Sequence, residues 1–201
     1  MNSSNAKDVI DQFFDSLEKI QSLHSSDIPG IQLYMDQVTT FMEEHLGRHR
    51  RDLSEKVLTK TMINNYTKHH LLPPPEKKKY SREHMLILIF IYYYKTILPL
   101  QDIRALLEPL TERYFGKEGK DGEVSLQDIY DEVIRISADE IASIKADVER
   151  LYDKSMQTFS EIDESERDFL QIFVLISSLT LDVYIKKEMI SQLIDQYFQS
   201  K

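Results

Sequence analysis

The chain has 201 residues, 41% of them hydrophobic, and carries a net charge of −9. This suffices for one or two compact domains, and only five glycines and six prolines argue against a disordered chain. The absence of cysteine excludes disulfide frameworks and thiolate metal sites. Because the N-terminal stretch MNSSNAKDVI lacks the basic and apolar blocks of a signal peptide, we expect a cytoplasmic protein.

The first part of the chain predicts two helices. Apolar residues recur at helical spacing from Val9 to Leu23. A second helix is expected from about Gln32 to Leu46. Gly47 is a suitable terminator, because a left-handed residue after a helix costs glycine little.

The middle of the chain has clear start and stop signals. Thr59 is a good N-cap for the helix KTMINNYTKHH, and Pro73 to Pro75 are expected to end it. Ser81 can cap a long apolar helix through about Ile97, and Pro99 fits the first turn of the next one. Strand signals are nearly absent, apart from a short ribbon around Lys77–Tyr80.

The C-terminal part follows the glycine-rich segment 116–123, the best domain boundary in the chain. Ser125 and Ser137 are predicted helix caps, the latter with capping-box spacing to Glu140, and Ser165 is predicted to begin the last helix.

Two apolar runs, MLILIFIYYYKTILPL and FLQIFVLISSLTLDVYI, contain polar or charged interruptions, so we expect buried helices and no membrane span. The prediction is an all-α fold with an N-terminal helix (1–30) packing on the C-terminal bundle, a helix-turn-helix domain (31–115) and a helical dimerisation or sensing domain (124–201).

Positive charge is concentrated in one segment. Residues 45–82 hold ten Lys and Arg against three Asp and Glu, a net +7, so the remainder of the chain carries −16. This asymmetry indicates a basic working surface on an acidic body.

The helix after Thr59 carries a polar stripe opposite its apolar side chains Ile63 and Tyr66. Asn can read adenine in the major groove, while Lys and Thr hold phosphates. A basic loop directly after this helix can reach flanking phosphates. The expected DNA-binding residues are Lys60, Thr61, Asn64, Asn65 and Lys68 on the helix, and Lys77, Lys78, Lys79 and Arg82 beyond it. The plainer interpretation is a solvated helix face and a surface loop.

The order TKTMINNYTKHHLLPPPEKKKYSREHMLILI, followed by LPLQDIRALL, resembles the DNA-binding domain of MerR-type transcription regulators over about residues 57–108. The resemblance places Thr59 at an N-cap, Ile63 and Tyr66 inward, Tyr80 and Ser81 at the end of a wing, and LPLQDIRALL on a fourth helix. It implies a recognition helix (about 59–70) and a short basic wing (73–80).

This sequence departs from that pattern at several positions. Thr61 and Asn64 stand where many members carry Arg, and His70 stands where the helix-terminating Gly is usual. The wing lacks the Asn-Gly turn that favours a two-residue hairpin. The segments LYMDQVTTFM, LTKTMINNY and KKKYSREH also resemble an uncharacterised bacterial family with a MerR-like domain.

These features predict a homodimeric transcription regulator that binds double-stranded DNA, with an unidentified small-molecule effector as a further partner. The alternatives are a protein-interaction adaptor on the same scaffold, or a sensor with its pocket in the C-terminal bundle. We expect neither an enzyme nor a bound metal or cofactor. No phosphate-binding loop or nucleophile elbow occurs, and His45 and His49 are too few for a metal site.

Overall fold

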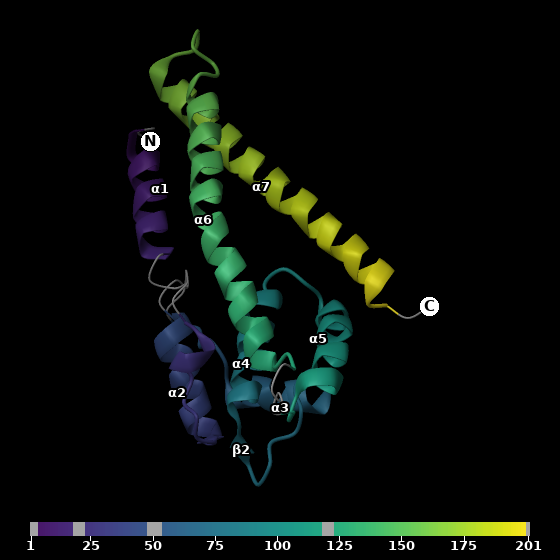
Figure 1. Ribbon diagram of the computed structural model, residues 1–201. Helices are drawn as coiled ribbons and strands as arrows, with labels where there is room; N and C mark the ends of the chain where they lie inside the picture. The colour runs from purple at the N-terminus through teal and green to yellow at the C-terminus, as the bar shows by residue number, and fades with distance from the viewer. Residues whose placement is uncertain (1–3, 18–22, 48–53, 118–122, 200–201) are drawn as a thin grey trace. The chain divides into compact units, whose positions relative to one another are not determined.

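The computed structural model describes residues 4–17, 23–47, 54–117 and 123–199 (Figure 1). The described residues form seven α-helices and one two-stranded ribbon, which confirms the predicted all-α class. In chain order the elements are α1 (Ser4–Leu17), a 3-10 turn (Ser25–Asp27), β1 (Leu33–Tyr34), α2 (Met35–Leu46), α3 (Lys60–Lys68), β2 (Lys79–Tyr80), α4 (Arg82–Tyr94), α5 (Leu100–Tyr114), α6 (Leu126–Met156) and α7 (Glu164–Tyr197).

The chain divides into two compact units, each continuous in space but not in sequence. We call residues 23–134 with 191–201 the core unit, and residues 1–22 with 135–190 the long-helix unit. Both α6 and α7 therefore contribute residues to each unit.

The core unit is built around α4, the predicted long apolar helix. Its residues from Met85 to Ile91 are all buried, which confirms that the first apolar run is a core helix. Two side chains at its C-terminal end form hydrogen bonds to the end of α2 and to the segment before α3. The Tyr92 hydroxyl donates to the Leu46 carbonyl at 3.2 Å, and the Lys95 ammonium donates to the Val57 carbonyl at 3.0 Å.

The start of α6 belongs to the core unit and is held by two polar anchors. The buried Tyr130 hydroxyl donates to the Leu23 carbonyl at 2.9 Å. The Asp131 carboxylate accepts from the Ser25 amide at 2.8 Å. Burial, with smaller contributions from Tyr93 and Asp131, raises the pKa of Tyr130, so this phenol stays protonated as a donor.

The long-helix unit contains α1 and most of α6 and α7. In α1, Phe14 is buried, and Asp11 lies 3.8 Å from the Lys145 ammonium of α6. The expected helix start at Ser137 is wrong, because Ser137 lies inside the continuous helix α6. A capping-box pattern starts a helix only where the preceding residues break one, and nothing before Ser137 does.

The second apolar run forms α7, but most of its large side chains are exposed rather than buried. Phe173, Ile176 and Leu181 are 59%, 58% and 60% exposed. Glu166–Tyr197 is also the one described helical segment that is long and apolar enough to cross a membrane, a test that soluble helices pass too. The expectation that the second apolar run is a buried helix is therefore wrong.

Candidate nucleic-acid interface

The start of α3 follows the predicted N-cap. The Thr59 side chain accepts a hydrogen bond of 3.1 Å from the Met62 amide, and residues 54–59 before it are not helical. Ile63 and Tyr66 are buried at 0% and 6% exposure, as the spacing predicts. Since these two residues fix the rotation of α3, the polar stripe on the opposite side faces solvent.

That stripe consists of Lys60, Thr61, Asn64, Asn65 and Lys68, and the structure places all five on the exposed face of one helix. Four of them make no side-chain hydrogen bond or ion pair with another described residue. Lys60 differs, because its ammonium forms an ion pair with Asp36 in the first turn of α2. The stripe therefore presents two amides, a hydroxyl and an ammonium to a partner.

The end of α3 comes before the prolines. His70 has a φ of 59°, the left-handed conformation that usually selects glycine. The Leu71 amide donates to the Tyr66 carbonyl at 2.9 Å, and the His70 amide donates to the Thr67 carbonyl at 3.2 Å. This is the Schellman pattern, and Leu71 is buried after it. The prediction that Pro73 to Pro75 end the helix is wrong in detail, because His70 already does so.

The lysine run forms a tight turn, although the sequence has no Asn-Gly. Lys77 and Lys78 have φ values of 49° and 65°, as the two central residues of a type I′ turn require. The Lys79 amide donates to the Glu76 carbonyl at 2.9 Å across this turn. We call residues 76–79 the lysine turn. It places the exposed Lys77 and Lys78 at its tip.

The lysine turn is attached to the start of α2. Strands β1 and β2 pair antiparallel, with Leu33 opposite Tyr80 and Tyr34 opposite Lys79. The sequence predicted a ribbon near Lys77–Tyr80 but not its partner strand. Tyr34 is also the N-cap of α2, and its amide donates to Gln37 Oε1 at 2.8 Å. The helix accordingly starts at Met35, three residues later than predicted, because Leu33 and Tyr34 are in the ribbon.

Helix α2 is the common support of both features. It contacts α3, β1 and β2, so the polar stripe and the lysine turn are fixed on one element (Figure 1). At its end, Gly47 has a φ of −74° and is right-handed, contrary to the expected left-handed stop. Residue Val57, before α3, is hydrogen-bonded to α2, because its amide donates to Glu43 Oε2 at 3.0 Å.

Lys79 and Arg82 lie at the base of the lysine turn and are more enclosed than its tip. The Lys79 ammonium lies 5.4 Å from the centroid of the Tyr34 ring. The Arg82 Nε donates to the Ile28 carbonyl at 3.2 Å. A Cβ on Gly30 would lie 3.2 Å from the Arg82 guanidinium, so glycine permits this close approach.

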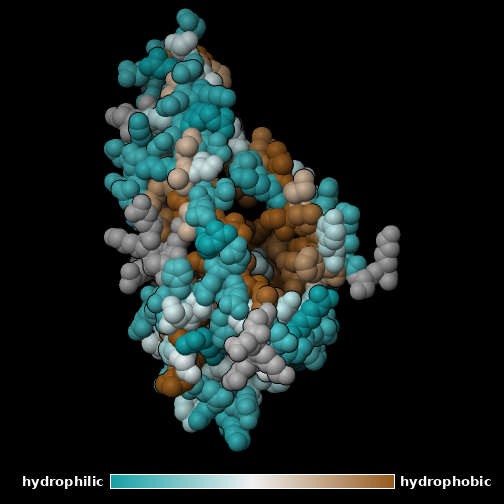
Figure 2. All heavy atoms as spheres, viewed as in Figure 1, coloured by the Kyte–Doolittle hydropathy of each residue, from teal (hydrophilic) through white to brown (hydrophobic). Residues whose placement is uncertain are grey.

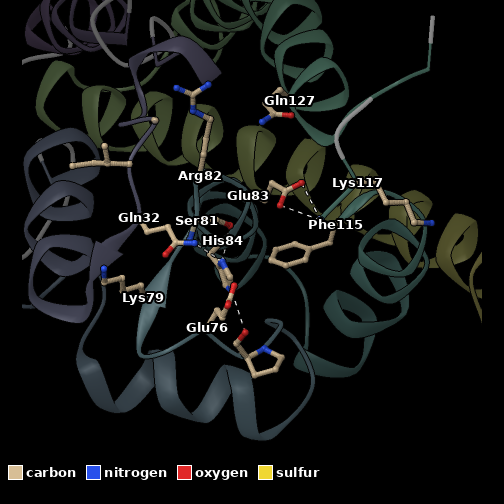
Figure 3. Close-up of a pocket in the computed structure, with 14 residues that line it drawn as sticks. Gln32, Glu76, Lys79, Ser81, Arg82, Glu83, His84, Phe115, Lys117 and Gln127 are labelled. Carbon is tan, nitrogen blue, oxygen red and sulfur yellow. Dashed lines mark hydrogen bonds between the residues drawn. The ribbon is translucent and has the colours of Figure 1, made fainter. Parts of the chain in front are cut away.

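His84 joins the base of the lysine turn to α4 (Figure 3). Its Nδ1 accepts from the Ser81 amide at 3.0 Å, and its Nε2 lies 3.4 Å from the Pro74 carbonyl. The imidazole is 4% exposed and makes edge contacts with Tyr80 and Phe115. Burial lowers its pKa, and hydrogen bonds to the Pro74 and Pro73 carbonyls oppose this only in part. A neutral ring with its proton on Nε2 fits this geometry.

An open pocket of about 640 Å³ adjoins this site. Its lining includes Gln32, Glu76, Lys79, Arg82, Glu83 and Lys117, so it is polar and carries both signs of charge. Among the described residues, no group of three or more His, Asp or Glu is placed to hold a metal ion.

Comparison with known proteins gives a family but no activity. Residues 23–133, more than half of the chain, match the family described as a domain of unknown function (DUF1836), and the chain belongs to that family. The match nearly coincides with the first segment of the core unit. This confirms that the domain belongs to an uncharacterised family, and the family description names neither a MerR-like domain nor a function. Searches of curated proteins and of solved structures found no match.

Proposed function

We propose that this protein is a transcription regulator that binds double-stranded DNA, using α3 and the lysine turn of a MerR-like scaffold. The observation that carries the proposal is the placement of the exposed polar stripe of α3 and the tight lysine turn on one support, α2. Both lie in the basic segment 45–82 of an otherwise acidic chain. The rest of the chain would repel DNA, so binding is restricted to this face.

In this proposal α3 enters a major groove. Asn64 and Asn65 are exposed side by side, and a bidentate Asn is the usual reader of adenine N6 and N7. Thr61 and Lys68 lie on the same stripe and would hold phosphates. Lys60 would exchange its ion pair with Asp36 for a phosphate contact.

The lysine turn supplies the second contact. Lys77 and Lys78 are the two central residues of a tight turn, so their backbone is already ordered when they meet the DNA backbone. Lys79 and Arg82 add positive charge at the base and hold the turn against Tyr34 and Ile28. Two copies related by a two-fold axis would bind a palindromic site.

One observation favours the adaptor alternative. Lys60 and Arg82 are already occupied, by Asp36 and by the Ile28 carbonyl, which reduces the charge free for phosphates. An adaptor would use the same exposed face for a protein partner and would show no affinity for DNA.

One observation favours an added sensing role. The pocket at the base of the lysine turn has about 640 Å³, within the usual range for small-molecule sites of roughly 300–1,000 Å³. A ligand there would touch the segment that carries the turn. A thermal-shift screen against charged metabolites tests this role, and a panel without any shift would count against it.

The DNA proposal is tested by binding of the purified full chain to mixed genomic fragments over a salt series. We expect retention at low salt that weakens steeply, with a log–log slope of about −0.9 for each phosphate contact. No retention at the lowest salt would reject the regulator and favour the adaptor.

A further inference from the structure

Helix α7 is apolar on two opposite faces, and only one of them is used within the long-helix unit. On the first face Gln171 and Leu175 are buried. The Gln171 amide donates to the carbonyls of Met156 and Thr158, both at 2.8 Å. Further along, Leu179 and Asp182 line a small pocket together with side chains of α6. This face is therefore committed to α6 and to the turn that follows it.

The second face is a stripe of exposed side chains at alternating spacings of four and three residues. Since each residue of an α-helix turns by about 100°, this spacing keeps them on one side, opposite Gln171 and Leu175. Phe169 and Phe173 are 56% and 59% exposed, and Ile176 and Val183 are each 58% exposed. Brown atoms gather along α7 in Figure 2. The stripe consists of Phe169, Phe173, Ile176, Thr180 and Val183, and we call it the α7 stripe.

Thr180 does not interrupt the apolar character of the α7 stripe. Its hydroxyl donates to the Ile176 carbonyl of its own helix at 2.8 Å, so its hydrogen bond is already made. The methyl group is then available for packing. Tyr184, which lies beside the stripe, is also more than half exposed.

A bilayer fits this helix poorly. The uncharged run from Phe169 to Leu181 is about 20 Å long at 1.5 Å per residue, shorter than the roughly 30 Å of a hydrocarbon core. Asp182 and Lys186 follow directly and form an ion pair of 2.7 Å. In addition, the Gln171 face of α7 contacts the end of α6, so lipid could not surround this helix on all sides.

We propose that the α7 stripe is the contact surface for a second copy of this chain, arranged antiparallel about a two-fold axis at Ile176. The spacing is self-complementary in this orientation. Phe169 of one copy comes opposite Val183 of the other, and Phe173 comes opposite Thr180. Each phenylalanine thus faces a smaller side chain, and Ile176 meets Ile176 of the other copy at the axis.

The charges at the two ends of the stripe agree with the antiparallel orientation. Glu166 lies beside the N-terminal end of the stripe and Lys187 lies at its C-terminal end, whereas the neighbouring charges Arg167, Asp168, Lys186 and Glu188 lie on other sides of the helix. An antiparallel pair brings Glu166 of one copy to Lys187 of the other, on both sides of the axis. A parallel pair would place like charges together.

The exposed area of the stripe supplies more than half of what a specific dimer needs, and the flanking polar side chains would have to supply the rest. Five exposed side chains on or beside the stripe, each about half of roughly 200 Å² for a large residue, provide about 500 Å² per copy. A standard interface buries about 800 Å² per partner. This contact does not depend on the DNA proposal.

The test is the mass of the full chain by sedimentation equilibrium, combined with a charge exchange. We expect a dimer, with a dissociation constant raised roughly tenfold by Glu166→Lys or by Lys187→Glu alone. The double exchange should restore the wild-type value, which also shows that the single variants are folded. Val124→Glu, which alters an exposed apolar residue of the core unit, should leave the mass unchanged.

Cysteine cross-linking reads the register directly, because the natural chain has no cysteine. Under mild oxidation Ile176→Cys should form a disulfide with itself. Phe169→Cys should not do so alone, but should cross-link in a mixture with Val183→Cys. A monomer at every soluble concentration would overturn the proposal. So would flotation of a monomer with phosphatidylcholine vesicles, or self-cross-linking by Phe169→Cys but not by Ile176→Cys.

Discussion

The Ser81 amide donates a hydrogen bond of 3.0 Å to His84 Nδ1, and this contact closes the first turn of α4 directly behind the lysine turn. The capping pair combines a predicted feature, Ser81 as N-cap, with an unpredicted one, a buried imidazole as its partner. Since the other ring nitrogen lies 3.4 Å from the Pro74 carbonyl, His84 connects both ends of the segment that carries Lys77 and Lys78.

Acid should destabilise the core unit through His84. Its folded pKa lies below the ordinary value of 6.5, so the unfolded chain binds the proton more readily. The stability contributed by the neutral ring is present above pH 6.5 and is lost as the pH falls from there towards the folded pKa. His84→Gln keeps a capping side chain but removes the titrating ring. Its melting temperature should therefore change less between pH 7 and pH 5 than that of the wild type. If the melting temperature of the variant depends on pH as strongly as that of the wild type, the pKa of His84 is the same in the folded and unfolded chains.

His70→Gly should stabilise the core unit by about 1 kcal/mol, because glycine takes the left-handed conformation at the end of α3 without a Cβ penalty. Urea unfolding measures this change in free energy. The neighbouring His69→Gly is the matched control, since His69 has a φ of −96° and gains nothing from glycine. Equal effects of the two variants would contradict the left-handed assignment.

Replacing Lys77 and Lys78 together by Asn and Gly should raise the unfolding free energy by about 1–2 kcal/mol while weakening DNA binding. Asn-Gly is the preferred pair for a type I′ turn, whereas two lysines are strained there. The informative outcome is a variant that is more stable than the wild type but binds DNA more weakly. A variant that is less stable than the wild type would refute the tight turn.

Asn64→Ala with Asn65→Ala should relax the sequence preference without changing the salt dependence. Amide contacts to bases carry discrimination of about 1–3 kcal/mol per pair but release no counterions. Selection of bound sequences from a random pool measures the preference. If the variant selects the same sequences as the wild type, these residues do not read bases.

The local signals of the sequence were sufficient for several helix starts in the core unit. Thr59, Ser81 and Ser125 cap the predicted helices, and Ile63 and Tyr66 point inward as their spacing requires. These outcomes depend on nearby residues, since a cap needs only the amides of the next turn.

Features that depend on distant residues could not be obtained in this way. The pairing of Leu33 with Tyr80 joins segments far apart in the chain. The lysine turn adopts a conformation that its residue types disfavour, so the surrounding strands must hold it. The exposure of α7 was missed because hydrophobicity alone does not distinguish a face that meets its own chain from one that meets another.

The most direct test of the proposed DNA interface is the salt dependence of binding for Lys77→Ala with Lys78→Ala, measured by fluorescence anisotropy on a genomic fragment that the wild type retains. The slope of log affinity against log salt should become shallower by about two contacts, close to 1.8 units. The control, Lys7→Ala with Lys154→Ala, removes the same charge from exposed positions on α1 and α6 and should keep the wild-type slope. Equal slopes for the two double variants would contradict the account.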